Sequence, residues 1–196
     1  RRNTLAIEGP GGSWSTYPQP FSDTDLVHFS PDRGELLVVD RTLPRRGAGD
    51  LVGIRVLSIA GEVVLDRRLP FEPVALEPET VVRIRRNVVL ALRRELPGID
   101  PTELEARVRE ELYFPRSYPP VTSAVLGSDG SIWLRAGAGA GGRVDWTVLS
   151  PSGDPVGLVN LPGALAILVA RSDRVWGVQH STMGVPYLRR LRIEKQ

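Results

Sequence analysis

Short β-type segments alternate with turns rich in Gly, Asp, Ser and Pro along most of the chain, and this alternation constrains the fold more than any other feature. Neighbouring segments flank short turns such as residues 30–34 and 127–130, so they are predicted to pair as antiparallel hairpins. Taken in order, they form two groups of four and one group of three. The predicted strands are residues 26–29, 35–40, 51–58, 62–69, 121–126, 131–136, 143–150, 154–160, 164–170, 175–180 and 186–193.

A repeated four-stranded antiparallel meander predicts an all-β fold made of β-propeller blades. One blade cannot bury its faces alone, so blades stack on their neighbours around a channel. A β-sandwich is the alternative, because its turns recur at similar spacing, but the repeated four-strand order favours the propeller. The chain is thus predicted to be a partial propeller domain over residues 1–196, with blades at about residues 21–71, 121–161 and 164–193.

One stretch breaks the β pattern and predicts two helices within a helical insertion at residues 72–120. A second helix is indicated by Asp100 as N-cap, Pro101 at the first helical position and Glu103 at the capping-box position. Apolar residues recur at helical spacing in both helices. The predicted buried stripes are Val81, Val82, Ile84, Val88, Val89, Leu92 and Leu96 in the first helix and Leu104, Val108 and Leu112 in the second.

Residues 30–41, 113–135 and 145–162 resemble bacterial six-bladed β-propeller proteins of the TolB-like superfamily. The resemblance covers about residues 20 to 193 and implies a bacterial protein exported to the periplasm or beyond the cell. It leaves the activity open, because propellers include binding, scaffolding and enzymatic proteins. The chain encodes fewer than three blades, so we expect the C-terminal half of a longer protein, or else a homodimer in which residues 3–9 add the missing strand.

The composition gives little information about the cellular compartment or the binding partners of the protein. The chain has no Cys, which removes disulfides and thiolate chemistry, and its net charge of +2 gives little reason to expect nucleic acid. Its longest apolar runs are too short to span a bilayer, so no membrane span is predicted. The start at Arg1 is interpreted as a processed end or an arbitrary boundary, with any export signal outside it.

Two features invite an enzymatic interpretation. Residues 137–142 satisfy the GxGxxG pattern, but a predicted strand follows them where a dinucleotide site needs a helix, so a loop and no cofactor are expected. His28 and His180 are the only imidazoles, and no GxSxG motif accompanies them. We interpret both as strand residues beside the core and predict no catalytic residue.

A metal-dependent hydrolase, lactonase-like or esterase-like, with its site in the channel is the alternative function. A hard cation such as calcium needs several oxygen ligands, and suitable residue types occur in strands and turns. Most of them are typical turn residues, so no metal site is predicted. The candidates are Asp23, Asp25, Asp40, Asn160 and Asp173.

Arginine and tryptophan residues are the remaining candidates for binding. We interpret the arginines as solvated surface that glutamates of the second helix neutralise, and the tryptophans as packing residues. The residues concerned are Arg83, Arg85, Arg86, Arg93 and Arg94 on the first helix, Arg189, Arg190 and Arg192 on the last strand, Glu103, Glu105, Glu110 and Glu111, and Trp14, Trp133, Trp146 and Trp176.

The resemblance implies that the helical insertion connects the outermost strand of one blade to the innermost strand of the next, on the face where the channel opens. Arg116 and Tyr118 in its Pro-rich end are therefore the predicted contacts with a ligand or protein partner. The alternative is that the helices only protect a blade edge from pairing. We predict a non-enzymatic ligand-binding or protein-binding propeller with the insertion as recognition element; a subunit of an extracellular assembly is a further possibility.

Overall fold

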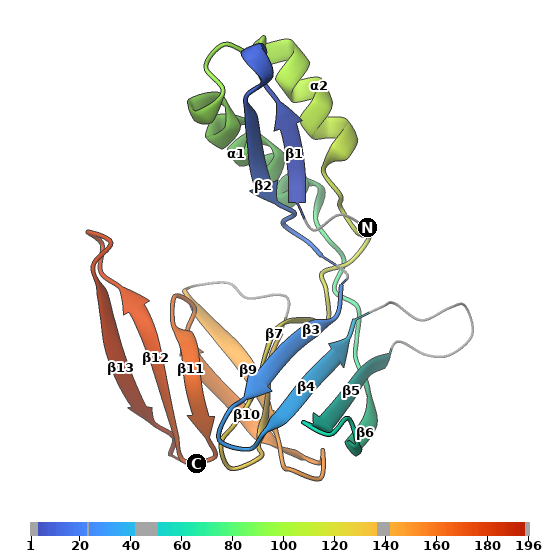
Figure 1. Ribbon diagram of the computed structural model, residues 1–196, viewed down its shortest axis with the longest axis vertical. Helices are drawn as coiled ribbons and strands as arrows, with labels where there is room; N and C mark the ends of the chain where they lie inside the picture. The colour runs from blue at the N-terminus through green and yellow to red at the C-terminus, as the bar shows by residue number, and fades with distance from the viewer. Residues whose placement is uncertain (1–3, 23, 42–50, 137–141, 195–196) are drawn as a thin grey trace. The chain divides into compact units, whose positions relative to one another are not determined.

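The computed structural model describes residues 4–22, 24–41, 51–136 and 142–194. It divides into two compact units, each described by itself below. The accessory unit consists of Arg1–Thr24 and Pro73–Tyr118, and the sheet unit consists of Asp25–Glu72 and Pro119–Gln196. The prediction of a mostly β chain with four-stranded antiparallel sheets and two helices is confirmed (Figure 1).

Three antiparallel meanders make up the sheet unit, and each follows the order of the chain. The strands of the first sheet are β3 (Leu26–Ser30), β4 (Glu35–Asp40), β5 (Leu51–Ser58) and β6 (Val63–Pro70). Those of the second are β7 (Val121–Leu126), β8 (Ile132–Ala136), β9 (Arg143–Leu149) and β10 (Pro155–Pro162). Those of the third are β11 (Ala166–Arg171), β12 (Arg174–His180) and β13 (Pro186–Arg192). The predicted grouping of four, four and three strands is thus confirmed.

The second sheet packs between the other two, which explains the unbroken apolar run of β8. Successive side chains of a strand point to opposite faces. Ile132 and Leu134 therefore join a core shared with Leu37 and Ile54 of the first sheet. Trp133, between them, joins a separate core shared with Val175 of the third sheet. Both faces of the second sheet are consequently buried at β8.

The first strands of the three sheets are neighbours, because β7 contacts both β3 and β11. A buried arginine reinforces the contact between the first two sheets. Arg41, just after β4, is 6% exposed and donates from Nη1 to the carbonyl oxygen of Val121, 3.1 Å away. Burial lowers the pKa of its guanidinium.

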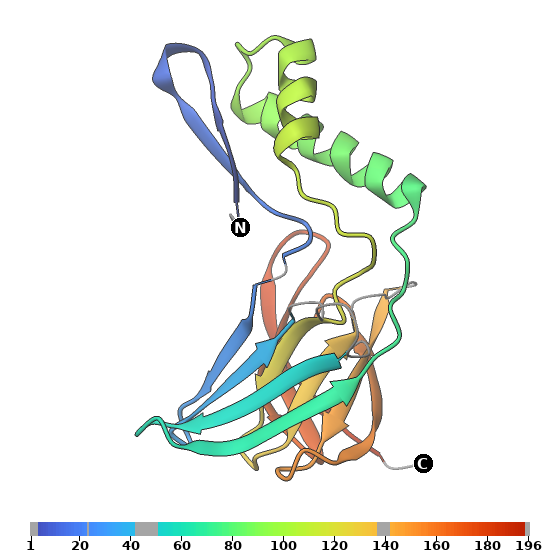
Figure 2. The same cartoon turned by 90° about the vertical axis from the view of Figure 1, so that its right-hand side faces the viewer.

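The accessory unit is a β-hairpin packed on two helices. Its elements are β1 (Thr4–Glu8), a 3₁₀ turn η1 (Pro10–Gly12), β2 (Trp14–Pro18), α1 (Pro78–Glu95) and α2 (Pro101–Glu111). Leu5 and Ile7 alternate onto one face of β1 and are buried against helix residues such as Leu92 and Leu104. Figure 2 shows the hairpin and the helices as two layers.

Two predictions about the N-terminal part are corrected by this packing. The described residues 4–9 do not extend the third sheet: β1 pairs only with β2 among the described strands, and its apolar face packs on the helices. The first sheet begins at Leu26, as its predicted strand did, but the boundary of its unit lies at Asp25 and not at about residue 21. Phe21 belongs to the accessory unit, where its ring contacts Phe114 and Tyr118 at 6.1 and 5.7 Å between centroids.

Both predicted helices are present, and the N-cap of the second is confirmed. Asp100 Oδ1 accepts hydrogen bonds from the backbone nitrogens of Thr102 and Glu103, at 2.9 and 3.1 Å. The Glu103 carboxylate pairs with Arg107 instead of completing a capping box.

One residue of the predicted buried stripe of α1 was predicted wrongly. Val82 is 62% exposed, because it lies at the edge of the helix face that enters the core. In the described chain, neither helix is long and apolar enough to cross a membrane.

Candidate functional site

Equivalent turns of the three sheets meet at one end of the sheet unit (Figure 1). Each of these turns joins the first and second strands of its sheet. The backbone nitrogen of Ser128 donates to the carbonyl oxygen of Ala170, 3.0 Å away, which links the second sheet to the third. Gly130 has φ of 84°, and an added Cβ would lie 3.2 Å from Cζ of Arg33 in the first sheet. Glycine at this position therefore allows both the turn and the close approach of the neighbouring sheet.

The Asp129 carboxylate organises this row of turns. Its Oδ1 accepts a hydrogen bond from Ser131 Oγ at 2.6 Å, and Ser131 Oγ in turn accepts one from Trp133 Nε1 at 2.9 Å. Its Oδ2 accepts from the backbone nitrogen of Ser172 at 2.6 Å. Burial by itself would raise the pKa of Asp129, but the hydrogen bonds from Ser131 and Ser172 outweigh it and lower the pKa. The ionised carboxylate thus connects the second sheet to the third.

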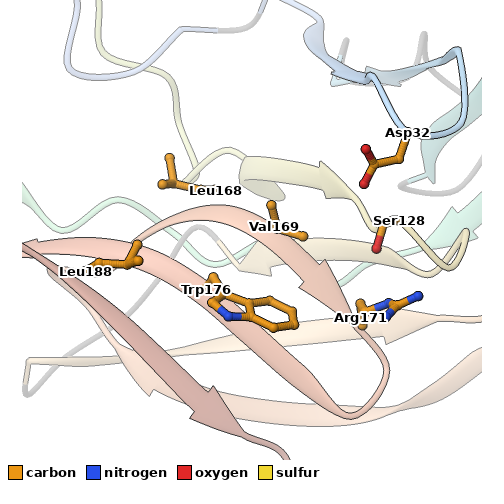
Figure 3. Close-up of a pocket in the computed structure, with 7 residues that line it drawn as sticks. All are labelled: Asp32, Ser128, Leu168, Val169, Arg171, Trp176 and Leu188. Carbon is orange, nitrogen blue, oxygen red and sulfur yellow. The ribbon is translucent and has the colours of Figure 1, made fainter.

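A hollow of about 570 Å³ opens beside these turns. Figure 3 shows Leu168 and Leu188 at one side, Trp176 in the middle, and Asp32 and Arg171 at the other side. Its lining consists of Asp32, Ser128, Leu168, Val169, Arg171, Trp176 and Leu188.

The lining combines an apolar side with two opposite charges. Such a surface can hold an amphipathic ligand whose polar end lies near Asp32 and Arg171. The indole of Trp176 is already engaged, because the guanidinium carbon of Arg174 lies 5.7 Å from the ring centroid. A ligand that stacks on the same face of the indole would have to displace Arg174.

The predicted contact residues Arg116 and Tyr118 both lie in the accessory unit. The Tyr118 ring packs nearly edge-on against Phe21, and its backbone nitrogen donates to the carbonyl oxygen of Val74 at 2.8 Å. Arg116 is exposed, and its carbonyl oxygen accepts from the backbone nitrogen of Leu76 at 3.1 Å. The structure gives Tyr118 a packing role, and contact of either residue with a ligand stays a prediction.

The two histidines lie on different sheets and have different surroundings. His28, on β3, accepts a hydrogen bond at Nδ1 from the backbone nitrogen of Leu126 on β7, 3.1 Å away. Burial lowers the pKa of His28, which favours the neutral ring that this bond needs. His180 is exposed at the end of β12. His28 therefore connects the first and second sheets.

The described metal-ligand candidates do not gather into a cluster of three or more. Asn160 Nδ2 donates to Asp145 Oδ1 at 2.7 Å, and Asp173 accepts from Arg174 Nε at 2.8 Å. Asp25 and Asp40 lie just before β3 and at the end of β4, and Asp23 is outside the described residues. Among the residues that the structure describes, no group of three or more His, Cys, Asp or Glu side chains is arranged to hold a metal ion.

Two of the tryptophans are core residues, as predicted, and two are not. Trp133 and Trp146 are 0% and 3% exposed and pack between the second and third sheets. Trp14 is 62% exposed on the hairpin, and Trp176 lines the hollow.

The GxGxxG segment lies outside the described residues except for Gly142, which precedes β9 and not a helix.

The predicted solvated arginine surface is present on α1, but no described glutamate of α2 forms an ion pair with it. Glu103 of α2 pairs with Arg107 of the same helix at 2.6 Å. Arg85 is turned toward the core, with its guanidinium carbon 5.4 Å from the Phe114 ring centroid. The other α1 arginines are exposed and form no ion pair or hydrogen bond with any described residue: Arg83, Arg86, Arg93 and Arg94.

The arginines of the last strand have different surroundings. Arg189 donates to Gln179 Oε1 at 2.9 Å, within the third sheet. Arg190 and Arg192 border a depression of about 350 Å³ together with Asp173 and Arg174. The acidic side chain there is paired with Arg174, so part of the positive charge is offset locally.

Sequence reasoning did not identify Asp129, Arg41 or the lining of the hollow. The sequence did contain one indication of this site, in the positions of its residues. Asp32, Ser128 and Arg171 lie in or next to the turn between the first and second strands of each predicted group. Equivalent turns of stacked repeats lie side by side, so polar residues there are candidates for shared contacts.

Comparisons with protein-family models, with curated proteins and with solved structures found no match to this chain.

Proposed function

We propose that this chain is part of a non-enzymatic binding protein, in which the stacked sheets are consecutive blades of a β-propeller and the accessory unit is the recognition element. Support for the blades comes from three meanders that share cores in pairs and bring their first strands together. The row of linked turns supports the same arrangement, since equivalent turns would be neighbours around a ring.

The observation that carries the proposal is the independent core of the accessory unit. The two helices lie in the connection between β6 and β7, and the N-terminal hairpin packs on them to bury Leu5, Ile7, Val88, Leu92 and Leu104. A connection that only joined two strands would need far fewer residues. Inserted segments on a rigid scaffold commonly carry recognition, so we assign recognition to this unit.

Further blades are proposed to complete the ring. The first sheet exposes Val27 and Phe29, at 61% and 48%, and the third exposes Leu168 and Leu188, at 55% and 68%. Exposed apolar faces of this kind are typical of surfaces that another part of an assembly covers. The additional blades would come from a longer chain or from a second copy, in an exported bacterial protein.

A version without the accessory unit tests the recognition assignment. The chain ends of the insertion are held together, since Ala75 and Ser117 form a β-bridge, so a short Gly/Ser linker can replace residues 76–116. Residues 1–22 are removed too, because Leu5 and Ile7 would otherwise lose their cover.

Both versions are used as bait in an envelope extract of the source organism, and retained proteins and small molecules are quantified. A partner that only the intact chain retains would support the proposal, provided that circular dichroism shows a folded sheet unit in both. Equal retention would remove the accessory unit from recognition.

Leu168 and Leu188 also line the hollow of Figure 3, so the alternative to a further blade on the third sheet is a small-molecule site on this face of the sheet unit. The apolar side of the hollow and its Asp32–Arg171 side fit a small amphipathic ligand. Ligand-observed NMR with a small-molecule library tests this function. Hits that are lost in Trp176→Ala and kept in Trp14→Ala would support it, and hits that are insensitive to Trp176→Ala would contradict it.

A further inference from the structure

We propose that the exposed face of α1 binds an acidic, amphipathic segment of a partner protein. In this arrangement Leu90 contacts an apolar side chain of the segment, and Arg83, Arg86, Arg93 and Arg94 pair with carboxylates around it. These five residues are called the arginine face. The inference rests on the proposed function, because it names the partner chemistry of the same recognition unit.

Helix geometry places Leu90 in the middle of the arginine face. Val88 and Leu92 are buried in the core, so the opposite side of α1 faces solvent. Residues three and four positions apart are neighbours on a helix surface. Arg86 lies four residues before Leu90 and Arg94 four residues after it, with Arg93 three after. The leucine is 45% exposed although arginines surround it.

No ion pair within the accessory unit offsets the positive charge of this face, although the exposed Glu79 lies four residues before Arg83 on the same helix. None of its four arginines has an ion pair or hydrogen bond to a described residue. The carboxylate of Glu103 on α2 is paired with Arg107, and Glu95 at the end of α1 accepts a hydrogen bond from Ser15. Charge complementarity therefore favours an acidic occupant.

Local helix stability explains only part of the pattern. Arg93 and Arg94 lie in the last turn, where cations are favourable for the helix dipole. Arg83 and Arg86 lie in the first half of α1, where this effect does not favour a cation. An exposed leucine also contributes nothing to solubility. An apolar centre with an arginine rim is instead the usual composition of a protein interface.

The same features favour a protein segment over a membrane or a nucleic acid. An interfacial membrane helix needs a wide apolar face, but the wide apolar face of α1 is buried in the unit, which leaves Leu90 and Val82 outside. A nucleic acid would pair with the arginines and leave the leucine without an apolar contact, since no exposed aromatic side chain lies beside it on α1 for a base to stack on.

Two synthetic peptides test the proposal by fluorescence anisotropy with the full chain. The first forms a helix with glutamates flanking a leucine stripe, and the second has the same charge with serines in place of the leucines. We expect the first peptide to bind at least about tenfold more tightly, because one buried leucine contact is worth a factor of this order. Raising the salt from about 50 to about 300 mM should weaken both.

Matched variants locate the binding. Arg86→Glu and Leu90→Gln should each weaken binding of the first peptide about tenfold or more. Arg109→Glu makes the same charge change at an exposed arginine of α2 and should leave binding within about twofold, because rim charges away from the contact have small effects. Circular dichroism should show the same helix content in all three variants.

Three results would overturn the inference: no binding of either peptide, equal effects of Arg86→Glu and Arg109→Glu, or tighter binding to anionic phospholipid vesicles or duplex DNA than to the first peptide. Failure here can be told apart from failure of the proposed function. If the natural partner is lost when the accessory unit is removed but is kept by the Arg86→Glu variant, the arginine face is wrong and the recognition assignment stands.

Discussion

The accessory unit and the sheet unit bury their apolar side chains in different ways. In the accessory unit one layer of strands covers one layer of helices, and a single core lies between them. In the sheet unit three layers share two cores, so the middle sheet is buried on both faces at β8 while the outer sheets each keep an exposed one. The two-layer unit buries its apolar side chains in one core, whereas the stack of sheets leaves apolar side chains such as Phe29 and Leu188 exposed on its outer faces.

Polar side chains connect distant segments in both units, but what they connect differs. In the accessory unit Asp100 caps α2, while Ser15, Gln19 and Arg107 connect the N-terminal segment to the helices. In the sheet unit His28, Arg41 and Asp129 each connect one sheet to the next. The accessory unit therefore holds a hairpin to helices, and the sheet unit holds sheet to sheet. Substitutions can break or sharpen this comparison, and they are given below from the largest expected effect to the smallest.

Trp133→Ala should lower the free energy of unfolding of the sheet unit by about 3–5 kcal/mol, because it leaves a cavity between two sheets. Trp133 is fully buried, and Ser131 would also lose its hydrogen-bond donor. Urea denaturation measures the change. Trp14→Ala, at an exposed tryptophan, is the control and should stay within about 0.5 kcal/mol of the parent. Equal effects would show that the middle sheet is not the centre of the sheet unit.

Leu92→Ala should lower the free energy of unfolding of the accessory unit by about 2–5 kcal/mol. Leu92 is buried between α1, α2 and the hairpin. Because that core is separate, the helical signal in circular dichroism should be lost at lower urea, while the tryptophan fluorescence of the sheet unit keeps its transition. Leu90→Ala, on the exposed face, is the matched control. A shift of both transitions together would mean that the units unfold as one.

Asp129→Ala should destabilise the sheet unit by about 1–3 kcal/mol, because donors at Ser131 and Ser172 lose their acceptor. The pKa of Asp129 is lowered in the folded state, so its contribution is present above the unfolded pKa of about 3.9 and is lost as the pH falls through the folded pKa. Urea midpoints across acidic pH should therefore fall less steeply in the variant. Asp66→Asn, at an exposed aspartate on β6, is the control and should change the free energy of unfolding at neutral pH by less than about 0.5 kcal/mol.

Asp100→Ala should lower the stability of the accessory unit by about 1 kcal/mol, because two backbone donors at the start of α2 lose their acceptor. The effect should be confined to the helical transition in urea. Glu105→Ala, at an exposed position of the same helix, should change it by less than about 0.5 kcal/mol. A larger shift in the fluorescence transition than in the helical one would contradict a local role for the cap.

Local patterns in the sequence predicted the elements well, because short-range chemistry decides them. Turn residues and the intervening apolar runs located the eleven strands of the sheet unit, and Asp100 with Pro101 marked the start of α2. The same patterns failed where a segment had a choice of partners. Residues 3–9 have the composition of a strand that could pair with several others, and their place on the helices depends on which face is free.

The candidate sites were predictable only in outline. An arginine-rich helix can be identified from its spacing, but whether the glutamates of α2 neutralise it depends on which partner each side chain reaches. The hollow brings together residues from all three sheets, and no short stretch of sequence contains more than a few of them. Arg116 and Tyr118 were singled out by resemblance, and of the two side chains the structure gives a ring contact to Tyr118, while Arg116 is bonded through its backbone.

The sequence by itself determined the mostly β character, the grouping of strands and the two helices, since periodicity and turn chemistry act between residues near in the chain. The tertiary structure alone decided that the hairpin joins the helices, that Asp129 links two sheets, and that Leu90 stays exposed among unpaired arginines. These outcomes depend on packing between segments far apart in the sequence, where geometry selects one partner among several of similar chemistry.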